Sequence, residues 1–219
     1  MLSLLGVFVF DSSALHVHLE RGDCRLRGED GQPLGPPAQR GRTVLHWHPL
    51  VEVPTSGGVH VIDALIHAVR CQEPRYAIAT LDSALNRGLV TGEQLDDVFG
   101  ALPRRYRTLR TFVDGRAQSG TETLVRLVLL RWGCRVDLQV RFAGVGHVDL
   151  LVDGWLVVEC DSREFHSSWE QQRKDYRRDR ALAALGYSVL RLTAEDVLYH
   201  PELVVAGLRG LIERYRAPL

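Results

Sequence analysis

Hydrophobic and polar residues follow two periods along the chain, and these periods predict its elements. In residues 15–20 (LHVHLE) and 43–48 (TVLHWH) apolar and polar residues alternate, which is typical of strands. Residues 57–70, 74–88 and 91–102 carry apolar residues at helical spacing. The first half of the chain is therefore predicted to form an α/β region of short strands followed by helices.

The second half has a clearer pattern. Residues 119–133 (SGTETLVRLVLLRWG) predict a helix that opens with Ser119 and Glu122 in capping-box spacing. The elements expected after it are a strand, a hairpin, a long helix, another strand and closing helices: 135–142, 147–161, 167–186, 187–192, 193–198 and 201–215. This order predicts an α/β fold in which helices flank one mixed sheet.

The stretch 114–120 (DGRAQSG) separates the two halves. Its glycine, serine and charged residues are typical of a loop. We therefore expect an N-terminal accessory region, residues 1–113, and a C-terminal domain, residues 114–219.

The hairpin at 147–161 carries acids where buried strand is expected, and two registers are open. A two-residue loop, Asp153-Gly154, would point Asp149 and Glu159 to opposite faces. A three-residue loop that starts at Val152 would instead make those two acids a diagonal pair on one face, with Asp161 one step further on. The other face would then be apolar and comprise Val148, Leu150, Val152, Leu156, Val158 and Cys160. The second register separates polar from apolar residues better and is preferred.

The acids of this hairpin suggest a metal site. Carboxylates at one edge of a sheet repel one another unless a cation lies between them. Oxygen ligands suit Mg²⁺ or Mn²⁺, and the backbone carbonyl of Cys160 could add one. Such a metal can polarise a phosphodiester and activate water. The alternative, that Asp149 and Glu159 are solvated strand ends, is equally compatible with the residues alone.

Composition narrows the classes of protein. The chain has 219 residues, of which 45% are hydrophobic and 25% charged, and this is enough apolar material for a core. A formal net charge of +0 argues against a generally basic DNA-coating protein. No apolar run approaches the roughly 20 residues of a membrane span, the N-terminus lacks a basic signal-peptide region, and the four cysteines show no CxxC spacing. These features predict a cytoplasmic protein with no membrane contact.

The order of acids and basic residues resembles the PD-(D/E)XK, or restriction endonuclease-like, superfamily. Glu122 on a helix is followed by Asp149, by Glu159-Cys160-Asp161, by D-x-x-R-D at 175–179 and by G-Y-x-x-x-R at 186–191. Residues 114–200 more narrowly resemble the uncharacterised branch related to very-short-patch-repair (Vsr-like) endonucleases. The resemblance implies a metal-dependent nuclease, with DNA as the usual substrate. The cysteine-rich zinc site of the repair enzymes has no counterpart, so mismatch repair is not implied.

The resemblance also implies roles for individual residues. Asp149 and Glu159 correspond to the metal ligands, and Glu122 would support them unless it merely caps its helix. Asp161 stands where the superfamily usually has a lysine, so a cation beside the attacking water is missing. His166 is the candidate to compensate, because a neutral imidazole can accept a proton from water; the alternative is an exposed loop histidine. The candidate catalytic residues are Glu122, Asp149, Glu159, Asp161 and His166.

The long helix at 167–186 carries a basic stripe. Its arginines at i, i+4 and i+7 share a face that could follow DNA phosphates, although interleaved acids offer helix-surface ion pairs as an alternative. Arg178 and Asp179 are expected to brace the acidic site, and Arg191 to face a phosphate or a carboxylate. The candidate nucleic-acid-binding residues are Arg173, Lys174, Arg177, Arg178, Arg180 and Arg191.

Histidines in the first half invite a zinc hypothesis, because alternate strand residues share a face. The residues concerned are His16, His18, Cys24, His46 and His48. No tight Cys/His pairing accompanies them, and half-buried strand histidines are the preferred interpretation. Related proteins often begin with a winged-helix segment, which would make residues 1–113 a partial DNA- or partner-binding module.

The preferred interpretation is a metal-dependent endonuclease that hydrolyses DNA. One alternative is a catalytically inactive DNA-binding protein on a decayed nuclease fold, which the missing lysine favours and the retained acids oppose. Another is an antitoxin- or defence-type regulator whose N-terminal region binds a protein partner. A homodimer would suit double-strand cutting, although nothing in the sequence requires one.

Overall fold

The computed structural model describes residues 1–20, 22–23, 25–27, 31–33, 35, 41–161 and 169–216, without the side chain of Gln171. The chain divides into two compact units, which we call unit 1 (Met1–Thr111) and unit 2 (Phe112–Leu219). No described helix has the length and hydrophobicity that crossing a membrane requires.

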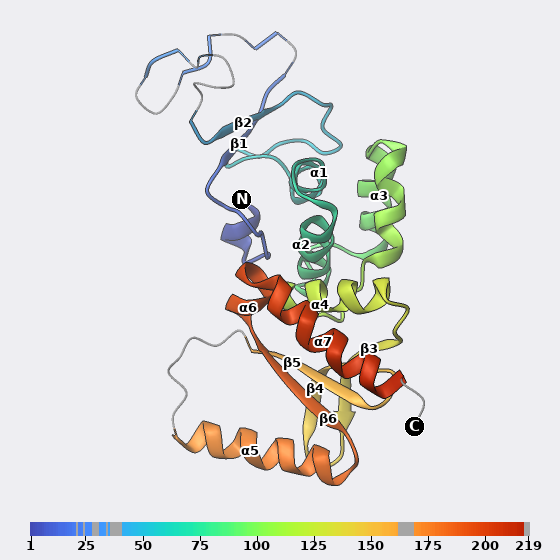
Figure 1. Ribbon diagram of the computed structural model, residues 1–219. Helices are drawn as coiled ribbons and strands as arrows, with labels where there is room; N and C mark the ends of the chain where they lie inside the picture. The colour runs from blue at the N-terminus through green and yellow to red at the C-terminus, as the bar shows by residue number, and fades with distance from the viewer. Residues whose placement is uncertain are drawn as a thin grey trace. The chain divides into compact units, whose positions relative to one another are not determined.

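Unit 1 joins a small parallel sheet to a group of helices (Figure 1). Its elements are η1 (Leu2–Leu5), β1 (Leu15–His18), β2 (Thr43–His46), α1 (Val61–Cys71), α2 (Pro74–Asn86) and α3 (Gly92–Ala101), and η3 (Arg104–Phe112) follows. The predicted strands and helices are confirmed, with shorter strands than the pattern suggested. Helix α1 buries most of its length because its apolar residues pack against α2 and α3.

Unit 2 is built on a mixed four-stranded sheet, as expected. The strands are β3 (Val136–Phe142), β4 (Gly146–Val152), β5 (Leu156–Asp161) and β6 (Ser188–Thr193), in the order β3-β4-β5-β6. Only the β5–β6 pair is parallel. The helices are α4 (Gly120–Arg131), α5 (Trp169–Ala184), α6 (Ala194–Tyr199) and α7 (Pro201–Arg216). Figure 1 shows α5 on the opposite side of the sheet from α7.

The β4–β5 hairpin closes in a register that neither sequence interpretation anticipated, so both predicted registers are wrong. Val152 pairs with Leu156, and three residues connect the strands: Asp153, Gly154 and Trp155. Asp153 and Gly154 both adopt left-handed backbone angles, with φ of 49° and 76°, because the tight turn requires them. Asp149 and Glu159 lie on these adjacent strands, each one residue beyond the last pair, Leu150 with Val158.

The strands are also irregular at the level of Asp149. Gln139, the residue of β3 opposite Asp149, has a φ of 53°. On the far side of this irregularity Val148 packs in one cluster with Val157 and with Leu182 of α5. The prediction that Val148 shares an apolar face with Leu150 is therefore wrong, because strict alternation does not survive the irregular backbone.

Candidate functional site

A chain of hydrogen bonds links an acid on α4 to an acid on β4. Gln139 Nε2 donates to Glu122 Oε2 at 3.0 Å and to Asp149 Oδ1 at 3.4 Å. Glu122 Oε2 also accepts from the backbone N–H of Gln118 at 2.9 Å. Ser119 caps α4 as predicted, with its Oγ accepting from the Glu122 N–H. The Glu122 carboxylate, however, turns toward Gln139, so capping alone does not account for it.

Glu159 is the most deeply placed acid of the hairpin, at 5% exposure. Arg178 Nη2 of α5 lies 2.8 Å from Glu159 Oε1 and forms an ion pair with it, and Arg178 also donates to the backbone carbonyl of His147. The partner of this buried carboxylate oxygen is therefore the Arg178 guanidinium. Asp149 Oδ2 lies on the adjacent strand and accepts from the backbone N–H of Cys160 at 2.8 Å.

A second arginine holds the acid at the end of β5. Arg191 of β6 is a bidentate partner of Asp179, with Nη2 2.8 Å from Oδ1 and Nε 3.1 Å from Oδ2. Its Nη1 reaches Asp161 Oδ2 at 3.2 Å. The hydrogen bonds to Asp179 raise the pKa of the Arg191 guanidinium. Of the two alternatives for Arg191, the structure shows the carboxylate, and it places this cation beside the acid that stands where the family has a lysine.

The buried acids hold their protons more tightly than free carboxyl groups. Burial raises the pKa of Glu122, and the neighbouring Asp149 carboxylate raises it further. Burial also raises the pKa of Glu159, although Arg178 opposes this shift. Burial and the surrounding carboxylates raise the pKa of the Cys160 thiol well above its usual value, so that thiol is not a nucleophile at neutral pH.

Glu122→Gln is expected to flatten the dependence of stability on pH. A carboxyl group whose folded pKa is raised stabilises the fold below its unfolded pKa of about 4.5, and this contribution is lost as the pH rises through the folded pKa. Glutamine keeps an acceptor for Gln139 but carries no charge. Urea unfolding between pH 4 and 8 without divalent metal should therefore show a smaller loss of stability in the variant. Exposed Glu213→Gln is the control, and equal pH slopes in Glu122→Gln and wild type would contradict the prediction.

The carboxylates are suitable donors for a hard cation. The Glu159 carboxylate has lone pairs beyond its ion pair with Arg178, and the oxygens of Asp149 keep lone pairs beyond their present hydrogen bonds. Of the described residues, only unit 1 contains a group of three metal-ligand residues whose donor atoms all lie within 4.8 Å of one another. The acids of unit 2 therefore offer one or two carboxylates rather than a closed cage. Mg²⁺ is commonly held by one or two carboxylates, with waters completing its coordination shell.

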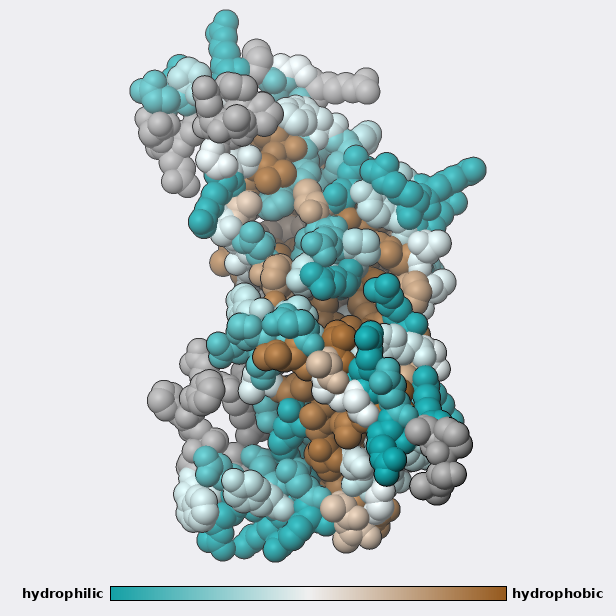
Figure 2. Space-filling model, in the orientation of Figure 1, coloured by the Kyte–Doolittle hydropathy of each residue, from teal (hydrophilic) through white to brown (hydrophobic). Residues whose placement is uncertain are grey.

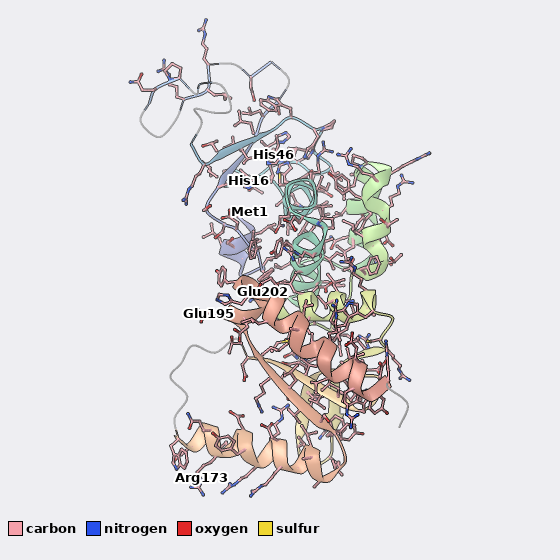
Figure 3. All side chains as sticks on the ribbon, viewed as in Figure 1. Met1, His16, His46, Arg173, Glu195 and Glu202 are labelled. Carbon is pink, nitrogen blue, oxygen red and sulfur yellow. The ribbon has the colours of Figure 1, made fainter. Side chains whose placement is uncertain are left out.

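The basic stripe of α5 lines an open groove. The groove between this helix and β6 has a volume of about 920 Å³. Its lining includes Arg173, Tyr176, Arg177, Arg180 and Tyr187. Arg173 is labelled on α5 in Figure 3, and Figure 2 shows mainly hydrophilic residues over this helix. Lys174 is exposed on the same helix.

The expected basic residues other than Lys174 separate into two sets. Arg178 and Arg191 lie against the acids, whereas Arg173, Arg177 and Arg180 line the groove. His166 lies outside the described residues. Gln139, which connects two of the acids, was missed from the sequence because nothing in a single strand shows that its side chain bridges α4 and β4.

Residues 122–212 match the model of the family REase_MTES_1575, a restriction endonuclease-like family. The match begins at the first acid of the site and runs through β6 into α7. The mixed sheet of this part of the chain is consistent with a restriction endonuclease-like core, and the family match suggests a nuclease-type function.

Similarity to known proteins extends beyond that domain. Over 217 residues the chain is 26% identical to two uncharacterized proteins of Mycobacterium tuberculosis, MT2308 of strain CDC 1551 / Oshkosh and Rv2248 of strain ATCC 25618 / H37Rv. Each match covers 96% of this chain and 73% of the relative. No solved structure shows a significant match to the chain.

Proposed function

We propose that the protein is a Vsr-like endonuclease that hydrolyses phosphodiester bonds of DNA with Mg²⁺ or Mn²⁺. One observation carries this proposal. Glu159 is buried and paired with Arg178, beside Asp149 on the neighbouring strand of a restriction endonuclease-like sheet. Burying a carboxylate is costly even when it is paired, so its presence at this edge favours a functional role.

The residues around the acids have separate tasks in this proposal. Asp149, Glu159 and the backbone carbonyl of Cys160 would hold the metal, which when bound polarises the phosphodiester and acidifies a water molecule. Glu122 orients Asp149 through Gln139, whose amide bonds to both carboxylates. Arg178 fixes the Glu159 side chain. Water must lose a proton as it attacks phosphorus, and His166 remains the candidate acceptor.

A plasmid-cleavage assay tests the proposed function. The purified full-length protein is incubated with supercoiled DNA and Mg²⁺ or Mn²⁺, beside a reaction with EDTA and one with Asp149→Asn. Nicked or linear DNA from wild type with metal alone supports the proposal. Cleavage that persists in EDTA, or that Asp149→Asn leaves unchanged, rejects the assigned site. Absence of cleavage on duplex, single-stranded and branched DNA rejects the proposal that the protein is a DNA endonuclease.

The groove beside α5 is where we propose that the DNA backbone lies. Planar guanidinium groups suit phosphate contacts, and contacts of this kind are sensitive to salt. The combined change of Arg173, Arg177 and Arg180 to glutamine is expected to weaken binding to any duplex and to lower the slope of log K against log salt by about 2–3, or roughly one per lost contact. Fluorescence anisotropy with a labelled duplex measures both quantities. The matched control changes Arg209 and Arg214 of α7, and an unchanged salt slope in the triple variant would place DNA elsewhere.

The second candidate function is an inactive DNA-binding or regulatory protein on the same fold. Asp161 in place of the usual lysine favours it, because its nearest cation, Arg191, is bidentate to Asp179. The two candidates differ in one measurement. Mg²⁺ should raise the melting temperature of wild type but not of Asp149→Asn if the acids bind metal, whereas an inactive DNA-binding protein would be stabilised by DNA alone.

A further inference from the structure

A cluster of histidines that the nuclease site does not use lies in unit 1. Parallel pairing of β1 with β2 sets His18 opposite His46, and even-numbered residues of both strands share a face. Helix α1 presents His67 and Cys71 on one side, since residues four apart lie one turn from each other. The cluster comprises His16, His18, His46, His48, His67 and Cys71; the sequence interpretation did not include the last two, and Cys24 lies outside the described residues.

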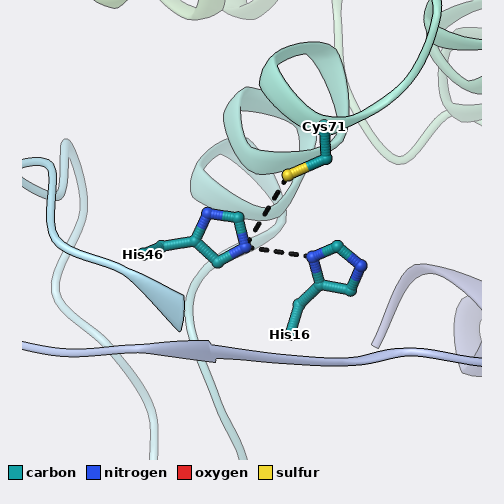
Figure 4. Close-up of side chains that lie close together, drawn as sticks. All are labelled: His16, His46 and Cys71. Atoms are coloured by element: carbon teal, nitrogen blue, oxygen red, sulfur yellow. Dashed lines mark hydrogen bonds between the residues drawn. The ribbon is translucent and has the colours of Figure 1, made fainter. Parts of the chain in front are cut away.

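The rings of this cluster are in close contact. The ring centroids of His46 and His67 are 4.0 Å apart, and those of His48 and His67 are 4.5 Å apart. One ring nitrogen from each of His46, His48 and His67 lies within 4.8 Å of the other two. His46 Nε2 also lies 3.0 Å from His16 Nδ1 and 3.9 Å from Cys71 Sγ (Figure 4).

Several ring nitrogens of this cluster are buried and have no hydrogen-bond partner in the part of the chain that the structure describes. His67 is 5% exposed, and its Nε2 has no hydrogen-bond partner among the described residues. His48 Nε2 and His18 Nδ1 are likewise buried atoms without a hydrogen-bond partner among these residues. Buried polar atoms in native proteins are almost always satisfied, and a cluster of orphaned imidazole nitrogens is a specific exception. A bound cation would satisfy several of them at once.

We propose that unit 1 binds one transition-metal ion of the Zn²⁺ class through His46, His48 and His67. Imidazole nitrogens suit borderline ions such as Zn²⁺, whereas Mg²⁺ prefers oxygen ligands. Three histidines leave one position of a tetrahedron for water. The His46–His16 contact orients the His46 ring, as a second hydrogen bond commonly does for a ligating imidazole. The ion would connect the β1–β2 pair to α1, independently of the acids in unit 2.

Metal titration of the full-length protein tests this site. Protein stripped with a chelator is titrated with Co²⁺, followed by visible absorption, and with Zn²⁺, followed by elemental analysis. One equivalent is expected to bind. His48→Asn and His67→Asn should each weaken binding at least about 100-fold, the upper end of the loss seen when an outer-shell partner is removed. His60→Asn is the matched control, because asparagine also caps α1 well and His60 lies outside the cluster.

Three outcomes would overturn the proposal. The first is no binding to wild type, and the second is binding that both asparagine variants leave unchanged. The third is binding that Cys71→Ser abolishes while His67→Asn does not, which would move the ion to the His16 side of His46. Circular dichroism of the stripped proteins separates ligand loss from misfolding. His48→Asn is less prone to misfold than His67→Asn, because His48 lies in the part-exposed segment after β2. The readout is metal bound through the histidines and not DNA cleavage, so failure of the nuclease proposal leaves this result intact.

Discussion

Glu159→Gln is expected to reduce metal-dependent cleavage of plasmid DNA by at least about 10²-fold, the scale on which loss of a single electrostatic contact acts at a transition state. Glutamine has nearly the same shape as glutamate but no charge to hold a cation. Glu159 is buried at 5% exposure, whereas the other acid of β5, Asp161, is exposed and contacts Arg191, so Asp161 does not replace it. The rate is measured as conversion of supercoiled to nicked DNA at saturating Mg²⁺.

The fold should survive this substitution. Burial already raises the pKa of Glu159, so the uncharged side chain removes an unfavourable charge while Arg178 keeps its contact with the His147 carbonyl. Glu213→Gln on the exposed face of α7 is the control and should cut as wild type does. Wild-type cleavage by Glu159→Gln with an intact circular dichroism spectrum would remove this residue from the site.

Arg178→Met is expected to destabilise the protein by about 2 kcal/mol at pH 8. Removing one partner of a fully buried ion pair costs about 3–5 kcal/mol, and the Arg178 side chain is 27% exposed, so the effect should be smaller. Without Arg178 the pKa of Glu159 rises further. Because a raised carboxyl pKa reduces stability as the pH rises above the unfolded value, the loss should be smaller at pH 5 than at pH 8. Urea unfolding at the two pH values measures it.

The double variant Arg178→Met with Glu159→Gln tests the cause. If the uncompensated carboxylate causes the loss, the neutral pair should recover most of the stability and show no pH dependence from this site. Exposed Arg177→Met on the same helix is the control, expected to change stability little. If the double variant is as unstable as Arg178→Met alone, the arginine acts through packing or its His147 contact rather than through the charge of Glu159.

The elements of both units were predictable because they depend on local pattern. The helical spacing of residues 119–133 and the Ser119 cap identified α4, and alternation identified β3 and β6. The hairpin was located correctly but its register was not. The three-residue connection starts one residue later than preferred, with Asp153 and Gly154 both left-handed, and these backbone angles depend on the twist of the paired strands as well as on local sequence.

By itself the sequence identified the candidate acids and, through the resemblance of its ordered motifs, the restriction endonuclease-like class that the family match supports for residues 122–212. The tertiary structure alone decided which side chains meet. Gln139 joins Glu122 to Asp149, Arg178 pairs with Glu159, and His67 enters the histidine cluster from α1. These contacts connect residues far apart in the chain, and their formation depends on packing that no local period records.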